Sequence, residues 1–247
     1  MSDLPARFPP RQAGKNSYGI VTLTHRSPLY DAMDAVKRRQ YARLPHVFVY
    51  NEPRDRPKDD TDLIYVSSGV HPIGAPMMLE KFVWFIDRYL DREPWVRCTH
   101  IVRGNTSTFL NLPLLARAIA ELPQRKCYAG NVDWAQFVSG RCIIFSRDAA
   151  RRLADWYRLR AWLKSTVADD LVIGKAMRRM GIRMRNMPTV FLDRDVIPPD
   201  GAIAEMLRRA PLIRVRNDKD RMGIDLPIWA ALERVSNRLQ SEGALPP

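Results

Sequence analysis

The sequence predicts an α/β domain whose first half holds a mainly parallel sheet and whose second half is mixed. Apolar, β-rich runs alternate with helical patterns through the first half, as in parallel α/β folds. Beyond that half the regular alternation stops. Hydrophobic residues make up 46% of the 247, and six are Trp, which is enough for one packed core. Residues 1–16 are rich in Pro and polar side chains, so we expect a flexible arm before a single domain of residues 17–247.

The elements of the first half follow from hydrophobic spacing. Buried parallel strands are apolar on both faces, and such runs occupy residues 18–24, 46–50, 62–67 and 99–102. Helical patterns cover residues 29–43, 77–90 and 112–122. We therefore expect strands and helices to alternate through most of this half, with the strands mainly parallel.

The second half is expected to combine strands and helices without that order. Strands are predicted at residues 128–130, 137–145, 184–192 and 213–216. Helices are predicted at residues 147–163, from 169 onwards, at 202–209 and at 226–239. Gly181 is expected to end the helix that begins at Asp169, because glycine readily adopts the left-handed conformation found at helix C-termini.

The net charge of +13, from 40 Lys and Arg against 27 Asp and Glu, favours polyanionic partners. These are nucleic acid, an anionic membrane surface or phosphorylated substrates, and an inert basic surface is the plain alternative. A nucleic-acid-binding module needs its basic residues gathered on one face. The Arg residues are instead scattered over every predicted helix, so we expect no nucleic-acid partner.

Compartment is indicated by three features. No apolar run approaches the roughly 18–20 residues that span a bilayer, and the first residues lack the apolar stretch of a secretion signal. Cys98, Cys127 and Cys142 have no paired spacing, which is typical of free thiols in a reducing compartment. We expect a cytoplasmic protein, and the basic charge allows peripheral contact with the inner face of a membrane.

A polar stretch follows the strand predicted at residues 99–102. Asn105, Thr106, Ser107 and Thr108 lie where the chain leaves the sheet. Ligands of open α/β sheets bind at the carboxyl ends of strands, and these small side chains offer hydrogen bonds without bulk. The alternative is a simple Ser/Thr/Asn cap of the following helix.

An acidic pair, Asp169 and Asp170, opens a helix of the second half. The helix macrodipole stabilises negative charge at this end, so helix capping and a functional carboxylate are both open interpretations. A functional carboxylate would need partners, and the polar stretch and residues 137–140 are candidates.

A basic cluster lies in the C-terminal segment, in I-R-V-R-N-D-K-D-R. Arg suits bidentate phosphate contacts and Lys supplies a point charge, whereas a solvated charged turn is the alternative. The cluster consists of Arg214, Arg216, Lys219 and Arg221.

Other catalytic signatures are absent from the sequence. There is no G-x-G-x-x-G or G-x-x-x-x-G-K-[ST] phosphate loop and no G-x-S-x-G. His25, His46, His71 and His100 lack the spacing of metal ligands, so a zinc site is not expected.

Taken together, these blocks resemble a known family. The order runs strand-T-H-R, D-L-I-Y-V, M-L-E-K-F-V-W-F-I, I-V-R-G-N-T-S-T-F-L-N-L, Y-A-G, F-V-S-G-R-C-I-I-F-S-R-D-A-A, D-D-L-V-I-G and R-V-R-N-D-K-D-R. It is similar to the β-1,3-galactosyltransferase and Fringe type of GT-A glycosyltransferase, in a bacterial-type version. The resemblance covers roughly Tyr18 to Leu232. It implies a GT-A-like single domain with a Rossmann-like, mainly parallel nucleotide-binding half and a mixed acceptor-binding half.

The resemblance also implies an activity: transfer of a hexose from a nucleotide-sugar, with a UDP-sugar favoured, to an acceptor hydroxyl with inversion. The acceptor would be a glycan or lipid-linked glycan in surface polysaccharide or lipopolysaccharide assembly. Asp170 matches the family's catalytic base, with Asp169 beside it. Residues matching the acceptor site are Trp134, Ser139 and Gly140, and Thr24, His25 and Arg26 match the end of the nucleotide-proximal first strand.

The metal motif is where this sequence departs from the family. Phe109 to Leu112 match the residues that follow the family's acidic D-x-D motif, but Asn105, Thr106 and Ser107 occupy the acidic positions. Amides and hydroxyls are poorer ligands for Mn²⁺ or Mg²⁺ than carboxylates. We therefore predict no cofactor and expect side-chain cations to offset the negative charge of the diphosphate. These are Lys81, Arg103, Arg214, Arg216, Lys219 and Arg221. The alternative is a Mn²⁺ or Mg²⁺ ion bound through phosphate oxygens, water and Asp169.

Two alternatives from other classes stay open at this stage. One is a non-catalytic relative that kept the fold and binds nucleotide-sugars without turnover. The other is a basic nucleic-acid-binding protein, which the scattered Arg residues disfavour. A nucleotide-sugar enzyme of a different α/β type is a weaker alternative.

Overall fold

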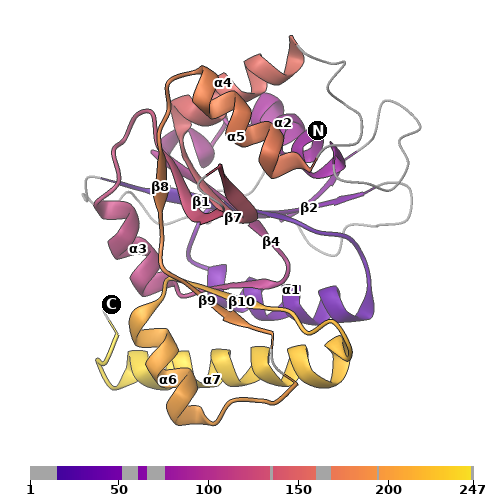
Figure 1. The fold of residues 1–247 in the computed structure, drawn as a ribbon, viewed down its shortest axis with the longest axis vertical. Helices are drawn as coiled ribbons and strands as arrows, with labels where there is room; N and C mark the ends of the chain where they lie inside the picture. The colour runs from indigo at the N-terminus through magenta and orange to yellow at the C-terminus, as the bar shows by residue number, and fades with distance from the viewer. Residues whose placement is uncertain are drawn as a thin grey trace.

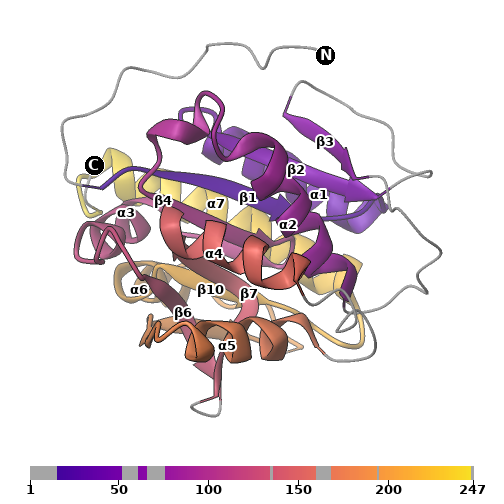
Figure 2. The same ribbon diagram turned by 90° about the horizontal axis from the view of Figure 1, so that it is seen from above.

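The computed structural model describes residues 16–51, 61–65, 76–133, 136–159, 168–193 and 195–245. In this part of the chain a central sheet has helices α2, α4 and α5 over one face (Figure 1). The other face carries α1 and α3, and beyond them a small sheet packs against α6 and α7. Figure 2, which views the molecule from above, shows α2 and α4 lying across the central strands.

The central sheet has the strand order β3-β2-β1-β4-β7-β6-β8 in the described residues. β3, β2, β1 and β4 run parallel, and β7 alone runs against its neighbours β4 and β6. The strands span β1 Tyr18–Leu23, β2 His46–Asn51, β3 Asp62–Tyr65, β4 His100–Asn105, β6 Tyr128–Asp133, β7 Phe137–Ser146 and β8 Met184–Asn186. The sheet is therefore mostly parallel, as the sequence predicts.

A second sheet of order β5-β10-β9 lies below the first. Its strands are β5 Thr108–Leu110, β9 Thr189–Leu192 and β10 Leu212–Val215. β10 runs antiparallel to β5 and parallel to β9. This pairing carries the C-terminal segment back to the residues that follow β4, and it positions the site described below.

The helices follow the predicted patterns closely. They span α1 Pro28–Tyr41, α2 Pro76–Tyr89, α3 Leu112–Ala120, α4 Arg147–Arg158, α5 Asp169–Arg179, α6 Asp200–Arg209 and α7 Leu226–Ser241, with the short turns η1 Trp95–Arg97 and η3 Arg221–Asp225. Gly181 has φ +68°, so it ends α5 in the left-handed conformation expected of it.

Alternate residues along the strands face two different cores, as the strand period of two requires. Val21 and Val47 point towards α2, α4 and α5, whereas Ile20 and Phe48 point towards α3. A third core joins α1 to the small sheet, α6 and α7 around Trp229. These cores hold the ends of β1 and β4 rigidly on both sides.

Two expectations about strands are wrong. The stretch from Asn105 does not pass directly into a helix, because β5 intervenes and pairs with β10. The single strand expected at 184–192 is two strands that belong to different sheets: β8 pairs with β6, and β9 pairs with β10. Such long-range pairings cannot be read from local periodicity.

Some expectations fall outside the described residues, among them the arm at 1–15, the end of the strand expected at 66–67 and the helix end at 160–163. Within the described residues, all three cysteines are buried and unpaired, as predicted. Among the helices that the structure describes, none is long and apolar enough to cross a bilayer.

Candidate functional site

The carboxyl ends of β1 and β4 meet at one edge of the central sheet. Leu23 lies opposite Asn105 in the parallel register of these strands. Just beyond, the Thr106 hydroxyl donates a hydrogen bond of 2.9 Å to Oγ1 of Thr24. The first-strand turn and the polar stretch, far apart in sequence, thus lie side by side at the edge where α/β sheets bind ligands.

The polar stretch does not cap a helix. Asn111, at the start of α3, makes no side-chain cap. Instead, the Thr108 hydroxyl donates to the side-chain oxygen of Asn105 at 2.9 Å and holds the turn before β5. The capping interpretation of these residues is therefore wrong.

Arg214 extends from β10 onto this turn. Its Nη1 donates to the side-chain oxygen of Asn105 at 2.9 Å, because β10 and β5 place Arg214 opposite Thr108. Arg214 is only 9% exposed. In the described part of the chain no carboxylate forms an ion pair with it, so its charge is not compensated.

Burial and neighbouring charges both disfavour the protonated form of Arg214. Burial, and after it the positive charges of Arg216, Arg141 and Arg221, lower the pKa of Arg214 to about 10. A buried cation among other cations is electrostatically prepared to receive an anion.

Arg221 approaches the same turn from the other side. Its Nη2 donates to the Ser107 hydroxyl at 2.9 Å, and its Nη1 donates to the Tyr30 hydroxyl at 3.0 Å. Nε of Arg221 bonds the fully buried carboxylate of Asp225 at 2.9 Å. Arg221 is thus half-buried and held next to Ser107 by hydrogen bonds from all three of its nitrogens.

Arg216 and Lys219 do not share this position. Nε of Arg216 lies 3.2 Å from Asp218, and Nζ of Lys219 lies 2.7 Å from Asp195. The side chains of Arg216 and Lys219 are 56% and 79% exposed, respectively. The predicted cluster therefore splits into an inner pair, Arg214 and Arg221, and an outer pair that matches the alternative of a solvated charged turn.

The residues at the polar turn do not fit a divalent cation. Asn105 and Ser107 are neutral, and each already accepts a hydrogen bond from a guanidinium group. A hard cation prefers carboxylate oxygens and would be repelled here by Arg214 and Arg221. Within the described ranges there is no group of three or more His, Cys, Asp or Glu that could hold a metal.

The acidic pair opens α5 and faces β4 and β7. Asp169 forms an ion pair with Arg103, a residue of β4 that is 3% exposed. Asp170 accepts hydrogen bonds from the backbone N–H of Gly140 at 3.3 Å and of Leu171 at 3.0 Å. Of the two interpretations left open for the pair, helix capping does not describe Asp169, because α5 has no side-chain cap and this carboxylate pairs with Arg103.

Lys81 lies below the end of β1 and is 1% exposed. Its Nζ donates to the carbonyl oxygen of Thr24 at 2.6 Å and lies 3.5 Å from that of Val49. Lys81 thus bonds backbone oxygens at the ends of β1 and β2, and its expected role against a diphosphate stays a prediction.

Arg26 and His25 follow the first strand on the outside of the turn. Arg26 pairs with Asp62 at 2.8 Å and stacks over the Tyr50 ring at 3.8 Å. His25 is exposed, and its ring packs edge-on against Tyr30 at 4.5 Å. Both lie beside Thr24, near the polar turn.

Sequence reasoning missed a buried charged pair on α1. Asp34 and Lys37 are each 1% exposed. Asp34 accepts from the Thr24 hydroxyl at 2.9 Å, and Nζ of Lys37 donates to the backbone oxygen of Asn105 at 2.7 Å. The signal was present, since both residues lie on the stripe that carries Met33. Together they tie α1 to both segments of the site.

Two of the three residues expected at the acceptor side lie in the described part of the chain. Ser139 is buried on β7, and Gly140 beside it contacts the acidic pair. Trp134 lies outside the described residues.

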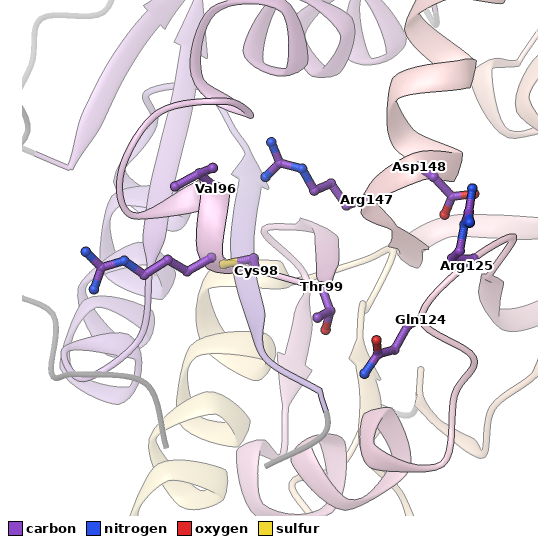
Figure 3. A pocket seen from close by; sticks show the side chains of 8 residues that line it. Val96, Cys98, Thr99, Gln124, Arg125, Arg147 and Asp148 are labelled. Atoms are coloured by element: carbon purple, nitrogen blue, oxygen red, sulfur yellow. The ribbon is translucent and has the colours of Figure 1, made fainter. Parts of the chain in front are cut away.

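A pocket of about 470 Å³ lies at the opposite end of β4, where Thr99 precedes the strand (Figure 3). Arg97 and Arg147 line it, but Glu93 pairs with Arg97 at 2.8 Å and Asp91 pairs with Arg147 at 2.5 Å. These two cations are already compensated by carboxylates, so we assign no role to the pocket.

Comparisons with known proteins bear on the fold. No protein-family model matches the sequence, and no curated protein is similar to it in sequence. Among solved structures, a glycosyltransferase involved in glycosylation of the major capsid of PBCV-1 is similar, with a TM-score of 0.53, 10% identity, and coverage of 85% of this chain and 98% of that one. The glycosyltransferase GlyE of Streptococcus pneumoniae TIGR4, in its apo form, has a TM-score of 0.50 at 8% identity, over 94% of this chain and 65% of that one. The chain thus has the mixed α/β, mostly parallel fold of GT-A glycosyltransferases.

Proposed function

We propose that this protein is a glycosyltransferase that moves a sugar from a nucleoside-diphosphate sugar to an acceptor hydroxyl. The observation that carries the proposal is the buried guanidinium of Arg214, which bonds neutral Asn105 at the carboxyl end of β4. In the described residues it has no carboxylate partner, so an anion bound there would supply the missing charge. A diphosphate is such an anion, and the fold supports this class of ligand at this edge.

Arg221 supports the same ligand from the side of Ser107. Two guanidinium groups flank the polar turn, each presenting a planar set of donors suited to phosphate oxygens. The outer residues Arg216 and Lys219 contribute less, because each already faces a carboxylate and water.

Departure of the nucleoside diphosphate requires stabilisation of its growing negative charge. Fixed positive groups aimed at that charge act strongly in a site of low dielectric. Since the turn does not fit a divalent cation, Arg214 and Arg221 perform this function in the proposal. Binding and transfer then need no added metal.

Asp170 is the proposed general base. It would accept the proton of the acceptor hydroxyl as that oxygen bonds to the anomeric carbon and the bond to the diphosphate breaks. A single displacement of this kind inverts the anomeric configuration. Asp170 suits the role better than Asp169, because Asp169 is held in an ion pair with Arg103. General-base help contributes roughly 10²–10⁴-fold.

The finer assignments rest on the sequence resemblance. They are a UDP-hexose donor, a glycan or lipid-linked glycan acceptor, and a place in surface polysaccharide or lipopolysaccharide assembly. The Fringe-like subtype, the replacement of the acidic metal motif by Asn105 to Ser107, and contact with the inner face of a membrane belong to the same set of proposals.

The test is a titration of the purified protein with UDP, GDP, CDP and dTDP and with their hexose esters, in excess EDTA. One nucleoside diphosphate is expected to bind, and at a hundredfold excess over its Kd to stabilise the fold by about 2.7 kcal/mol. Release of nucleoside diphosphate from the hexose ester then measures turnover. Binding without turnover would identify a non-catalytic relative, and absence of binding by all four would refute the proposal.

A further inference from the structure

We infer that Arg103, Asp169 and Gly140 form a subsite for a hydroxyl group of a neutral hexose, next to Asp170. The inference rests on the proposed function and adds to it the chemistry of the sugar pocket. It also separates Arg103 from the phosphate-binding role that the sequence suggested.

The first observation concerns the guanidinium of Arg103. It is 3% exposed on β4, and one of its nitrogens, Nη2, pairs with Asp169. The other two nitrogens, Nε and Nη1, are buried without a hydrogen-bond partner in the part of the chain that the structure describes. A buried N–H that makes no bond is costly, so such groups usually have a partner in the functional state.

The second observation concerns Gly140 on β7. A Cβ built on Gly140 would lie 3.6 Å from Oδ1 of Asp169, 3.7 Å from Nη1 of Arg103 and 3.7 Å from Oδ2 of Asp170. Three polar atoms from two elements, β4 and α5, therefore surround the point where a side chain at position 140 would begin. Glycine leaves that point without a side chain of its own.

The donor and acceptor pattern defines the ligand. Arg103 only donates hydrogen bonds, whereas the carboxylates of Asp169 and Asp170 only accept them. A hydroxyl both donates and accepts, so it satisfies both kinds of neighbour at once. An amine or a carboxylate satisfies only one of them.

Charge separates this subsite from the polar turn. One guanidinium and two carboxylates give the subsite a formal charge of −1, which repels phosphate. At the polar turn the balance is the opposite: two guanidinium groups, Arg214 and Arg221, are offset by a single carboxylate, Asp225, which pairs with Arg221. The diphosphate would therefore bind at the polar turn, and the sugar hydroxyl would bind at the subsite.

The hydroxyl has two sources: the sugar carried by the donor or the acceptor sugar. Two binding measurements distinguish them. The first compares a nucleoside diphosphate with its hexose ester, and the second titrates methyl glucoside and methyl galactoside into protein saturated with the nucleoside diphosphate.

Gly140→Ala is the test variant. The contacts of 3.6–3.7 Å are ordinary van der Waals distances, so alanine fits, and the N–H of residue 140 still bonds Asp170. The matched control is Gly201→Ala on α6, where a Cβ has nothing within 4 Å. Arg103→Lys is a second variant, which keeps a charge for Asp169 but lacks the free nitrogen of the guanidinium.

We expect Gly140→Ala and Arg103→Lys to bind the nucleoside diphosphate within twofold of wild type. Both should lose at least tenfold in affinity either for the hexose ester, which assigns the subsite to the donor, or for the methyl hexosides, which assigns it to the acceptor. Affinities for all sugars within twofold of wild type would overturn the inference, as would equal weakening of the nucleoside diphosphate itself. A wild-type protein that binds no nucleoside diphosphate would instead overturn the proposed function, and this inference with it.

Discussion

Nη1 of Arg214 donates a 2.9 Å hydrogen bond to the side-chain oxygen of Asn105, and these two residues are 109 positions apart in the chain. The amide of Asn105 holds the guanidinium in place but leaves its charge uncompensated. A carboxylate at position 105 would hold the guanidinium and also compensate its charge. The neutral residue thus preserves the positive potential that a diphosphate would use.

Asn105→Asp should therefore weaken the binding of nucleoside diphosphate, although it restores an acidic residue to the turn. The new carboxylate would form an ion pair with Arg214 and repel the ligand. We expect a loss of about 10–100-fold, the range that corresponds to about 1.5–3 kcal/mol for a charged hydrogen bond. Titration calorimetry in EDTA measures it, with Asn237→Asp on the exposed face of α7 as the control. Equal or tighter binding in EDTA would contradict the electrostatic argument.

Arg214→Gln should weaken nucleoside-diphosphate binding by about 10–100-fold for the same reason. Arg216→Gln is its matched control, two residues away on the same segment, and should stay within twofold because Asp218 and water already surround that charge. Arg214→Gln should also unfold at a higher urea concentration, since it removes a buried, uncompensated charge. Equal effects of the two variants on binding would show that only overall charge matters.

Asp170→Asn should leave nucleoside-diphosphate binding nearly intact and lower kcat by two or more orders of magnitude, roughly the contribution of a general base. Asp169→Asn should act differently, because it breaks the ion pair with Arg103 and lowers the urea midpoint as well as activity. Steady-state kinetics and urea unfolding of both variants separate the two roles. Near wild-type kcat in Asp170→Asn, together with its loss in Asp169→Asn, would reverse the assignment.

Asp34 should give the protein a measurable pH dependence of stability. Burial raises the pKa of Asp34 to about 6, although Lys37 and the hydrogen bonds from Thr24 and Tyr50 act in the opposite direction. In the unfolded chain a carboxyl titrates near pH 4, so between about pH 4 and pH 6 the folded state binds more protons. The free energy of unfolding of the wild type therefore falls as pH rises through this window.

Asp34→Asn lacks this titration. Relative to wild type, its free energy of unfolding should increase between pH 4 and pH 7 by about 2 kcal/mol. This is slightly less than the equivalent of two full pKa units, because the unfolded carboxyl is already partly ionised at pH 4. Urea unfolding at both pH values gives this difference directly, whatever the absolute stability of the variant. Parallel pH profiles for the two proteins would contradict the prediction.

Much of the fold was predictable because local pattern and tertiary position agree. The helix of residues 76–89 has one apolar stripe, and Gly181 has the backbone angle expected of a helix end. β5 was not predictable, since three residues form a strand only because β10 lies beside them. The break between β8 and β9 has the same cause, because each strand follows a different partner.

The candidate site was predictable by residue type but not by pairing. Asn105, Ser107, Arg214 and Arg221 were all identified from the sequence, yet nothing local distinguishes Arg214 from Arg216. The difference arises because β10 ends at Val215: Arg214 is held within the paired strand, whereas Arg216 lies just beyond it and meets water. Lys81 lies in the region expected for a phosphate-binding cation, but its ammonium group donates to a backbone carbonyl oxygen, that of Thr24.

The small sheet also sets an order of events during synthesis. Ser107 and Arg221 are separated by 114 positions, and Asn105 and Arg214 by 109. Chains emerge from the ribosome N-terminal end first, and contacts of such long range close late. β1 to β4 can therefore assemble before β10 exists, but the anion-binding corner cannot. On the proposed function, a nascent chain of this protein gains affinity for nucleotide only after its C-terminal segment has docked onto the finished strand edge.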